Sequence, residues 1–478
     1  MSILKDKTIV VGVSGGIAAY KAAELVRLLV TRGAQVRVMM TRNATEFITP
    51  LTLQTLSLNP VATATFSLTQ EPEIGHIRLA DSADAMVVAP ATANLIAKAA
   101  AGIADDIVTT VLLAARCPLA FAPAMNVHMY EHPTVAENLA KLRARGATII
   151  EPSAGALACG YEGKGRLMDP PVIVDEIERM LSPQDLAGER ILITAGPTQE
   201  AIDPVRFVSN RSTGKMGFAI ARAAWRRGAS VRLVAGPSAL ATPHGVERID
   251  AVNAGDLLSA TSRNFPWCSS LIMAAAVADF RPRKPAAQKL KKDANGLTLE
   301  LAPIADELPR LAAKKAGRLM IGFAAETQNL EVHALDKLRR KKLDLIVGND
   351  VSRSDAGFGV DTNIVTMLSA DGRMETTPKL LKDEVADVIL DRLVMLRAAK
   401  TKASPLRAFN STPCVKNGFF PYLLAPTGER ASEGKQAVKS LFQQPARRPY
   451  RRVFGPDASS RRATSMTPGL ERFSSPAD

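Results

Sequence analysis

Short apolar runs alternate with helical patterns along the first 180 residues of the chain. Residues 8–14 form the first apolar run and lead through a glycine turn into an amphipathic stretch over residues 16–32, which predicts a strand followed by a helix. Strands of the same kind are predicted at residues 35–41, 85–92 and 118–125. Apolar strands joined by helices indicate a parallel sheet that is covered on both faces.

The alternation starts again after a polar break at residues 182–188. Further strands are predicted at residues 190–198, 230–236, 269–279, 318–327 and 344–350, and helices at residues 215–228, 330–342 and 378–398. The pattern therefore predicts an α/β protein with two doubly wound, Rossmann-like domains and parallel sheets. We place the domains at residues 1–181 and 190–400, with a linker at residues 182–189.

The alternation stops after residue 400, where Pro, Ser, Arg, Gly and Gln dominate. We expect residues 401–478 to form a disordered basic tail, either a solvated segment or an arm that binds nucleic acid or an acidic protein. The whole chain has a net charge of +14, and this tail contributes +8 of it through 4 Lys and 9 Arg against 5 acidic residues. The charge therefore says little about the two domains, and we expect no nucleic-acid partner for them.

The cysteines show no paired metal-binding or disulfide spacing; they are Cys117, Cys159, Cys268 and Cys414. This usage favours a reducing compartment. No apolar run reaches the roughly 18 residues that a membrane helix needs, and the N-terminus leads directly into a strand. We therefore expect a cytoplasmic protein with no membrane partner.

Glycines and hydroxyl groups gather where the first predicted strands end. Ser14-Gly15-Gly16 closes the first strand and opens a helix, and Thr41 ends the next strand. Such a turn lets a phosphate approach backbone N–H groups at a helix N-terminus, although a plain strand–helix turn fits the same residues. The spacing is not that of a dinucleotide fingerprint.

Three further segments place polar side chains at strand ends or in a glycine-rich loop. They are APATAN at 89–94, AGIADD at 101–106 and PAMNVHMY at 123–130, and a loop CGYEGKGRL follows at 159–167. Asn126 lies in an apolar stretch, where an amide must find hydrogen-bonding partners. The glycines around Cys159 predict a mobile flap.

Together with Gly75-His76-Ile77, these segments resemble the FMN-dependent cysteine decarboxylase family over residues 5–180. The resemblance implies that His76 is a catalytic histidine, that Asn126 holds the substrate carboxylate and that Cys159 donates a proton. Taken alone, His76 fits a surface or helix-capping histidine and Cys159 an inert thiol. The positions implied for FMN contacts are Gly12, Ser14, Gly15, Ile17, Thr41, Ala89, Thr92 and Asn94. Tyr130 stands where Trp is common in that family.

A polar loop follows the first strand of the second half. Residues 194–217 read TAGPTQEAIDPVRFVSNRSTGKMG, in which Arg206 and Asn210 precede a predicted helix that opens at Lys215. Hydroxyls, N–H groups and cations in this arrangement suit an anionic ligand, and the spacing is not that of a Walker A motif.

This loop resembles the signature of the phosphopantothenate–cysteine ligase family, and the resemblance extends over residues 190–398. Further blocks of that family lie at residues 274–282, 289–292, 321–327, 337–350 and 357–368. The resemblance implies that CTP activates a carboxylate as an acyl cytidylate, which the amine of cysteine then attacks. Asn210 and Arg206 would contact the acyl cytidylate, and Lys289 would assist the attack. On charge alone, Lys289 also fits a solvated basic strand.

The remaining positions implied for CTP contacts are Ala274, Ala275, Asp279, Asp306, Phe323, Lys337 and Lys341. A triphosphate calls for Mg²⁺ between its oxygens, and the sequence does not indicate which residues hold the ion. The IADEL segment at 304–308 departs from the family, which has Pro before the Asp, so the geometry around Asp306 is open.

The two resemblances together imply a bifunctional phosphopantothenoylcysteine decarboxylase and phosphopantothenate–cysteine ligase of coenzyme A synthesis. They also imply decarboxylase trimers, ligase dimers and a dodecamer built from both. Two alternatives remain: a chain with only one active half, and a regulatory flavin-binding protein.

Overall fold

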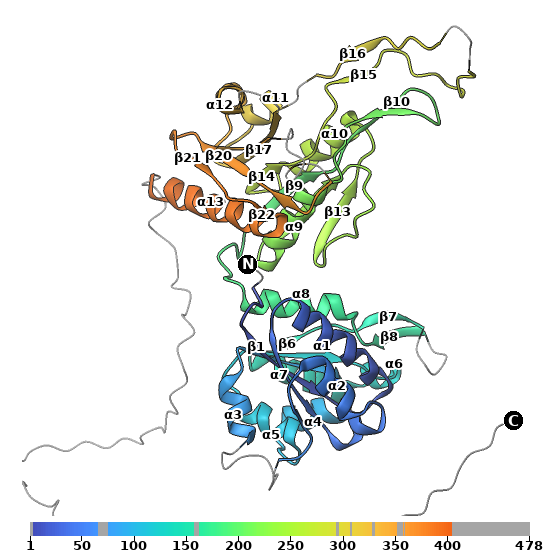
Figure 1. Ribbon diagram of the computed structural model, residues 1–478, viewed down its shortest axis with the longest axis vertical. Coiled ribbons are helices and arrows are strands. Elements are labelled where there is room, and N and C mark those ends of the chain that lie inside the picture. The colour runs from blue at the N-terminus through green and yellow to red at the C-terminus, as the bar shows by residue number, and fades with distance from the viewer. Residues whose placement is uncertain are drawn as a thin grey trace, which may run out of the picture. The chain divides into compact units, whose positions relative to one another are not determined.

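The computed structural model describes residues 3–65, 75–156, 162–292, 296–305, 308–326, 330–350, 357 and 359–403. These residues build two large β-sheets flanked by helices, one in each half of the chain (Figure 1). Cys159, Asp306 and all but the first three residues of the predicted tail lie outside the described residues.

The sheet of the N-terminal half has six strands, and every neighbouring pair in it is parallel. Their order is β3-β2-β1-β4-β5-β6. The strands are β1 (Thr8–Val13), β2 (Gln35–Met40), β3 (Val61–Ala62), β4 (Ala85–Ala91), β5 (Leu119–Pro123) and β6 (Thr148–Ile149). The sequence predicted four of these strands (β1, β2, β4 and β5) within two residues at each end, because most of their residues are apolar and buried.

Helices cover both faces of this sheet, as the continuous apolar strands predict. Side chains of α1 and α8 pack with Val11 on one face, and side chains of α4, α5 and α7 pack with Val10 on the other. The helices are α1 (Lys21–Thr31), α2 (Pro50–Ser57), α3 (Gly75–Ser82), α4 (Ala93–Ala101), α5 (Ile107–Ala114), α6 (Val127–Tyr130), α7 (Pro133–Ala144) and α8 (Pro170–Leu181), with 3₁₀ turns at Ile17–Tyr20 and Arg42–Glu46.

The second sheet has eight strands in the order β13-β12-β9-β14-β17-β18-β20-β21. The first six are parallel, and β20 and β21 join antiparallel at one edge. The strands are β9 (Arg190–Ala195), β12 (Ser230–Ala235), β13 (Val246–Asp250), β14 (Ser270–Met273), β17 (Leu319–Glu326), β18 (Leu345–Asp350), β20 (Val365–Ser369) and β21 (Met374–Thr376).

Two helical layers cover this sheet as well. Helices α9 and α13 pack on the face that holds Ile193, and α10, α11 and α12 pack on the face that holds Leu192. The helices are α9 (Lys215–Arg226), α10 (Ala254–Asn264), α11 (Leu308–Ala313), α12 (Leu330–Arg340) and α13 (Lys382–Ala403). The predicted helices at 215–228, 330–342 and 378–398 correspond to α9, α12 and α13.

Short antiparallel strand pairs complete the fold. They are β7 (Ser153–Ala156) with β8 (Glu162–Arg166), β10 (Gln199–Ala201) with β11 (Phe207–Ser209), β15 (Phe280–Pro282) with β16 (Leu301–Pro303), and β19 (Thr362–Asn363) with β22 (Leu380–Leu381). Strands β10 and β15 are in contact and run away from the second sheet (Figure 1). The predicted strand at 269–279 ends at Met273, because the next residues turn toward Thr194 and Gly196 to form hydrogen bonds.

Counted within each half, the six parallel strands follow the order 3-2-1-4-5-6, which is the doubly wound order. In such a sheet the connections from the two central strands run to opposite faces and leave a crevice at their carboxyl ends. The two crevices lie beyond β1 and β4 and beyond β9 and β14. The predicted fold class is therefore confirmed.

Candidate functional site

A hydrogen-bonded hydroxyl pair joins the carboxyl ends of β1 and β4. The Ser14 hydroxyl, which is 2% exposed, donates to the carbonyl of Pro90 at 2.8 Å and to the Thr92 hydroxyl at 3.1 Å. It also accepts from the backbone N–H of Thr92 at 2.9 Å. The Thr92 hydroxyl in turn accepts from the backbone of Leu95 and so caps α4. The two strand ends are thereby fixed to each other.

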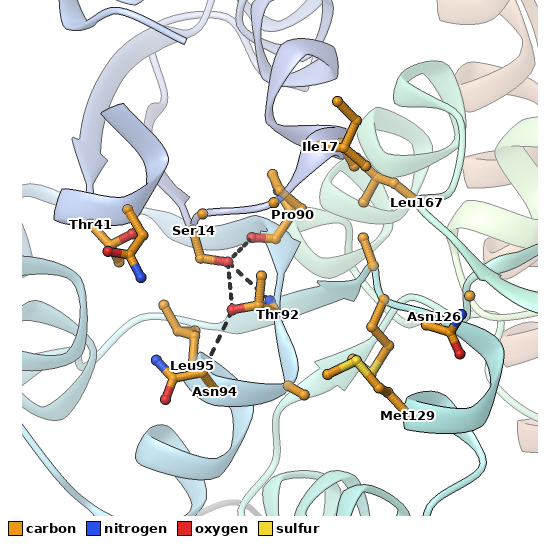
Figure 2. A pocket seen from close by; sticks show the side chains of 18 of the residues that line it. Ser14, Ile17, Thr41, Pro90, Thr92, Asn94, Leu95, Asn126, Met129 and Leu167 are labelled. Atoms are coloured by element: carbon orange, nitrogen blue, oxygen red, sulfur yellow. Dashed lines mark hydrogen bonds between the residues drawn. The ribbon is translucent and has the colours of Figure 1, made fainter. Parts of the chain in front are cut away.

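A cleft of about 750 Å³ opens beside this pair. Figure 2 shows Thr41, Ser14 and Asn94 on one side of the cleft and Asn126 with Met129 on the other. The cleft brings together most of the predicted cofactor positions with the predicted carboxylate-binding asparagine: Ser14, Gly15, Ile17, Thr41, Thr92, Asn94 and Asn126.

The glycine turn that opens the helix approaches a neighbouring loop very closely. A Cβ atom on Gly15 would lie 2.4 Å from the Asn43 Cβ and 2.6 Å from its carbonyl carbon, whereas a Cβ on Gly16 would meet its nearest atom at 3.5 Å. Only glycine fits at position 15 without a shift of backbone. Gly15 therefore allows the glycine turn and the loop that carries Asn43 to approach each other closely where both line the cleft.

Two predicted cofactor positions lie behind the cleft. Gly12 is inside β1, where an added Cβ would meet Val108 and Met39 at 3.1–3.2 Å, and Ala89 is fully buried in β4. Neither residue lines the cleft. The small size of Gly12 serves the packing of the sheet against α5, and Ala89 packs in the core on the other face, with side chains of α1 and α8.

Of the two described catalytic residues predicted for the N-terminal half, Asn126 lines the cleft and His76 does not. Asn126 caps α6, and its side-chain oxygen accepts from the backbone N–H of His128 at 2.9 Å. His76 is at the start of α3 and is not among the residues that line the cleft. Cys159, between β7 and β8, lies outside the described residues.

The hairpin β7–β8 is anchored beside Asn126. The backbone N–H of Met125 donates to the carbonyl of Gly165 at 2.9 Å, and a Cβ on Gly165 would lie 2.3 Å from the Met125 carbonyl oxygen. The β8 strand of this hairpin therefore packs against the loop that carries Asn126.

The cleft also contains charged residues that the sequence did not single out. Lys21, Arg42, Lys98 and Arg166 line it, and Lys98 binds both carboxylate oxygens of Asp105 at 2.8 Å. This hydrogen bond raises the pKa of Lys98 and lowers the pKa of Asp105. The AGIADD segment drew attention to the acidic side of this pair, but no pattern in the sequence indicated the lysine.

A second constellation surrounds the carboxyl ends of β9 and β14. The Asn210 amide donates to the carbonyl oxygens of Ala276 and Val277, each at 3.1 Å. The Thr194 hydroxyl accepts from the backbone of Ala275, and the Thr198 hydroxyl accepts from the backbone of Ala278. The predicted positions Asn210, Ala274 and Ala275 are therefore brought together at this edge.

The other predicted nucleotide contacts lie on neighbouring elements. Asp279 is exposed just beyond this segment, and Phe323 follows Gly322, which pairs with Met273 of β14. Lys337 is on α12 and Lys341 follows that helix, which packs on β17 and β18. Asp306 lies outside the described residues, so the altered loop at 304–308 stays untested.

Arg206 lies in a turn after β10 and reaches the segment that carries Lys289. Its guanidinium contacts the Asp203 carboxylate at 2.7 Å and donates to the backbone carbonyl of Leu290 at 2.5 Å. The Lys289 side chain is exposed. The sequence predicted Arg206 and Lys289 as site residues but did not indicate Asp203.

Two lysines hold the loop before β19, and the sequence analysis named only one of them, Lys215. Lys215 binds Asp361 at 2.7 Å, which lowers the pKa of that carboxyl group. The Lys382 ammonium donates to the carbonyl oxygens of Gly357 and Val360, and burial lowers its pKa. Lys215 opens α9, directly beyond the predicted anion-binding loop.

Two family models match the chain. Residues 2–182 match the model described as Flavoprotein, and residues 186–396 match the DNA/pantothenate metabolism flavoprotein C-terminal domain. The chain is 49% identical over 398 residues to the coenzyme A biosynthesis bifunctional protein CoaBC of Bacillus subtilis (strain 168), covering 82% of this chain and 98% of that protein. The chain belongs to the family of coenzyme A biosynthesis bifunctional proteins.

Other coenzyme A biosynthesis bifunctional proteins show the same extent of likeness. The protein from Escherichia coli (strain K12) is 47% identical over 396 residues, covering 82% of this chain and 97% of its own length. A crystal structure of the C-terminal domain of a coenzyme A biosynthesis bifunctional protein CoaBC is 42% identical, with a TM-score of 0.39, and covers 45% of this chain and 99% of that domain. Among the described residues, no helix is long and apolar enough to cross a membrane.

Proposed function

We propose that this chain catalyses two consecutive steps of coenzyme A synthesis. Its C-terminal half joins 4′-phosphopantothenate to cysteine through a CTP-derived acyl cytidylate, releasing pyrophosphate and CMP. Its N-terminal half decarboxylates the resulting 4′-phosphopantothenoylcysteine to 4′-phosphopantetheine with FMN. The observation that carries this proposal is the 49% identity to a bifunctional relative over almost all of that relative's length, together with the motif residues at the crevices of both sheets.

The proposed division of labour follows the two family matches. Residues 1–181 carry the decarboxylase, residues 182–189 link the domains, and residues 190–400 carry the ligase. Residues 401–478 lie beyond both matched ranges. The substrate has a free thiol, which stays reduced in a reducing compartment, so a cytoplasmic location suits this function.

The N-terminal cleft suits a flavin mononucleotide. Its glycine turn at Gly15 leaves no room for a side chain, and hydroxyls of Ser14, Thr41 and Thr92 line the same end of the cleft. The opposite wall contains apolar side chains, such as Ile17 and Met129, that can cover an isoalloxazine ring. When bound, FMN would take up the hydride that converts the substrate thiol into a thioaldehyde and would return it after CO₂ departs, while the C=S group accepts the electrons that CO₂ leaves behind.

The polypeptide's own part in decarboxylation is binding and proton transfer. Asn126 points into the cleft, where its amide N–H groups can hold the carboxylate of the substrate (Figure 2). Cys159 supplies a proton from the segment between β7 and β8. His76, at the start of α3, takes part in the proton transfers of the reaction.

In the ligase half, Asn210 and Arg206 hold the acyl cytidylate and Lys289 assists the attack of the cysteine amine. The nucleotide lies along the carboxyl edge of the sheet, with the residues Ala274, Ala275, Asp279, Asp306, Phe323, Lys337 and Lys341. Mg²⁺ arrives with the triphosphate as part of the substrate and neutralises the charge that builds on the leaving pyrophosphate.

Exposed apolar side chains support an oligomer. In the N-terminal half Ile17 and Tyr20 are 62% and 61% exposed at the rim of the cleft, which suits trimers that share flavin sites. The hairpins of the ligase half expose a second set, consisting of Val205, Phe207, Phe280, Leu297, Leu299 and Leu301, which suits dimers. Both contacts together give a dodecamer of four trimers.

The test follows three signals in one reaction. Purified protein is given 4′-phosphopantothenate, cysteine, CTP and Mg²⁺, and CMP, CO₂ and the flavin spectrum are measured together. We expect a flavin spectrum with CMP and CO₂ both rising. CMP without CO₂ would leave a ligase with an inactive flavin half, and a folded flavoprotein that makes neither product would favour the regulatory alternative.

Two substitutions assign each product to its half. Asn126→Asp places a negative charge against the substrate carboxylate, so we expect CO₂ production to fall while CMP release continues. Lys289→Gln should slow CMP release, and decarboxylation of added 4′-phosphopantothenoylcysteine should continue. The matched control is Lys292→Gln, three residues further along the same exposed segment.

A further inference from the structure

A buried carboxylate organises the turn between β10 and β11. The side chain of Asp203 has no exposed surface. One of its oxygens accepts from the backbone N–H groups of Val205 and Arg206, both at 2.8 Å. The other accepts from the Arg206 Nε at 3.0 Å and from the backbone N–H of Leu290 at 3.1 Å. The carboxylate thus joins the turn to a segment 87 residues further along the chain.

Both backbone polar groups of Leu290 are held by this turn. The N–H donates to Asp203, and the carbonyl accepts from Arg206. The backbone N–H of Ala286 also donates to the carbonyl of Ile202 at 2.9 Å. Residues 286–292 form no helix or strand, so these three bonds supply the order that a regular element would otherwise provide.

We propose that Asp203 is a positioning residue for Lys289 in the ligase reaction. This inference rests on the proposed function, in which Lys289 assists the attack of the cysteine amine. Lysine has a long flexible stem, and its exposed ammonium group can be placed accurately only if its backbone is fixed. Asp203 fixes the peptide that directly follows Lys289, while Arg206 fixes the next one.

Hydrogen bonds keep the Asp203 carboxyl group ionised. Burial acts to raise its pKa, but the hydrogen bonds from Val205, Leu290 and Arg206 outweigh burial and lower the pKa to about 2. The carboxylate therefore stays ionised and keeps its N–H donors throughout the pH range in which the protein would work. A neutral amide at this position has a single acceptor oxygen and cannot satisfy the turn and Leu290 together.

The experiment separates the two chemical steps in the full chain. Pyrophosphate release without cysteine reports formation of the acyl cytidylate, and CMP release with cysteine reports the amine's attack. For Asp203→Asn we expect the first step to stay within about twofold of the wild type and the second to slow by about ten- to a hundredfold, because small misplacements cost this much. Asp203→Glu, which keeps the negative charge but displaces the carboxylate by one methylene group, serves as a second variant if Asp203→Asn does not fold, with the same expectation for the two steps.

The turn between β20 and β21 offers a matched control. Asp371 accepts from the backbone N–H of Arg373 at 3.2 Å and pairs with the Arg373 guanidinium at 3.4 Å, at the far edge of the sheet. We expect Asp371→Asn to leave both steps unchanged. Decarboxylation of added 4′-phosphopantothenoylcysteine reports in every variant whether the other half is intact.

A double variant shows whether Asp203 acts through the lysine. If it does, Asp203→Asn combined with Lys289→Gln slows CMP release no more than Lys289→Gln alone. Full additivity, an equal loss in both steps, or an unchanged second step would each overturn the inference. A wild-type chain that releases no pyrophosphate from CTP would instead refute the proposed function, and the inference with it.

Discussion

A side chain at Gly15 in the N-terminal cleft would clash with the neighbouring loop. Because an added Cβ would lie 2.4–2.7 Å from the side chain and backbone of Asn43, Gly15→Ala must push the two loops apart. Overpacking of this kind costs about 1–3 kcal/mol. We expect flavin affinity to fall about tenfold or more, which corresponds to at least about 1.4 kcal/mol, as measured by titrating the stripped protein with FMN.

Gly16→Ala provides the comparison for this prediction. Its added Cβ meets only the Thr92 methyl group, at 3.5 Å, which is ordinary contact. Flavin affinity should stay close to that of the wild type. Equal losses in the two variants would show that the glycines matter for local flexibility and not for the close approach at Asn43.

Single residues also show what the sequence could and could not predict. Ser14, Thr92 and Asn126 line one cleft, because polar groups at the ends of parallel strands meet at the carboxyl edge of the sheet, and their binding roles stay predictions. Gly12 and Ala89 lie behind it, since the faces of a strand that is apolar throughout cannot be told apart from sequence. Asp203 was missed because its partner is 87 residues away.

At the scale of elements, the hairpin β7–β8 controls the loop that carries Asn126. Gly165 has a φ of +155° and would bring a Cβ within 2.3 Å of the Met125 carbonyl oxygen. We expect Gly165→Ala to displace this loop and to lower CO₂ production by about ten- to a hundredfold, with CMP release unchanged. The measurement is the ratio of CO₂ to CMP in the coupled reaction.

The same hairpin contains the control. Gly155 has a φ of +150°, so Gly155→Ala carries a similar backbone strain, but its added Cβ has only an Arg166 nitrogen near it, at 4.0 Å. If both alanine variants lose CO₂ production equally, backbone strain and not the contact with Met125 explains the effect.

Elements differed in how well their sequences predicted them. The central strands β1, β4, β9 and β17 were predicted because most of their residues are buried on both faces and apolar. The hairpin strands β10, β11, β15 and β16 have only three residues each and expose large apolar side chains such as Phe207 and Phe280. Three residues are too few to show the alternation of apolar and polar positions that identifies a strand.

At the scale of the whole molecule, the matched families end before the basic C-terminal segment. The second family match ends at residue 396, and α13 ends at Ala403. We expect a chain truncated after residue 408 to keep both activities within about twofold, because both family matches end before that residue. Coupled CMP and CO₂ production of the two chains is the measurement.

Truncation also tests the alternative role of the segment. Residues 401–478 carry a net charge of +8, so an arm for nucleic acid would show binding that weakens steeply with salt and disappears on truncation. Binding of that kind, or a loss of either activity, would contradict the view that the two sheets account for the function.

The bonds that hold Leu290 have a consequence for proteolysis. Trypsin cleaves after lysine, and the exposed segment offers it Lys289, Lys291 and Lys292. The nitrogen of the peptide bond after Lys289 is the one that donates to Asp203, and a protease must take that N–H and the following carbonyl into its own extended binding site. Brief digestion should therefore cut after Lys291 or Lys292 and spare the bond after Lys289, and Asp203→Asn should expose that bond to the enzyme.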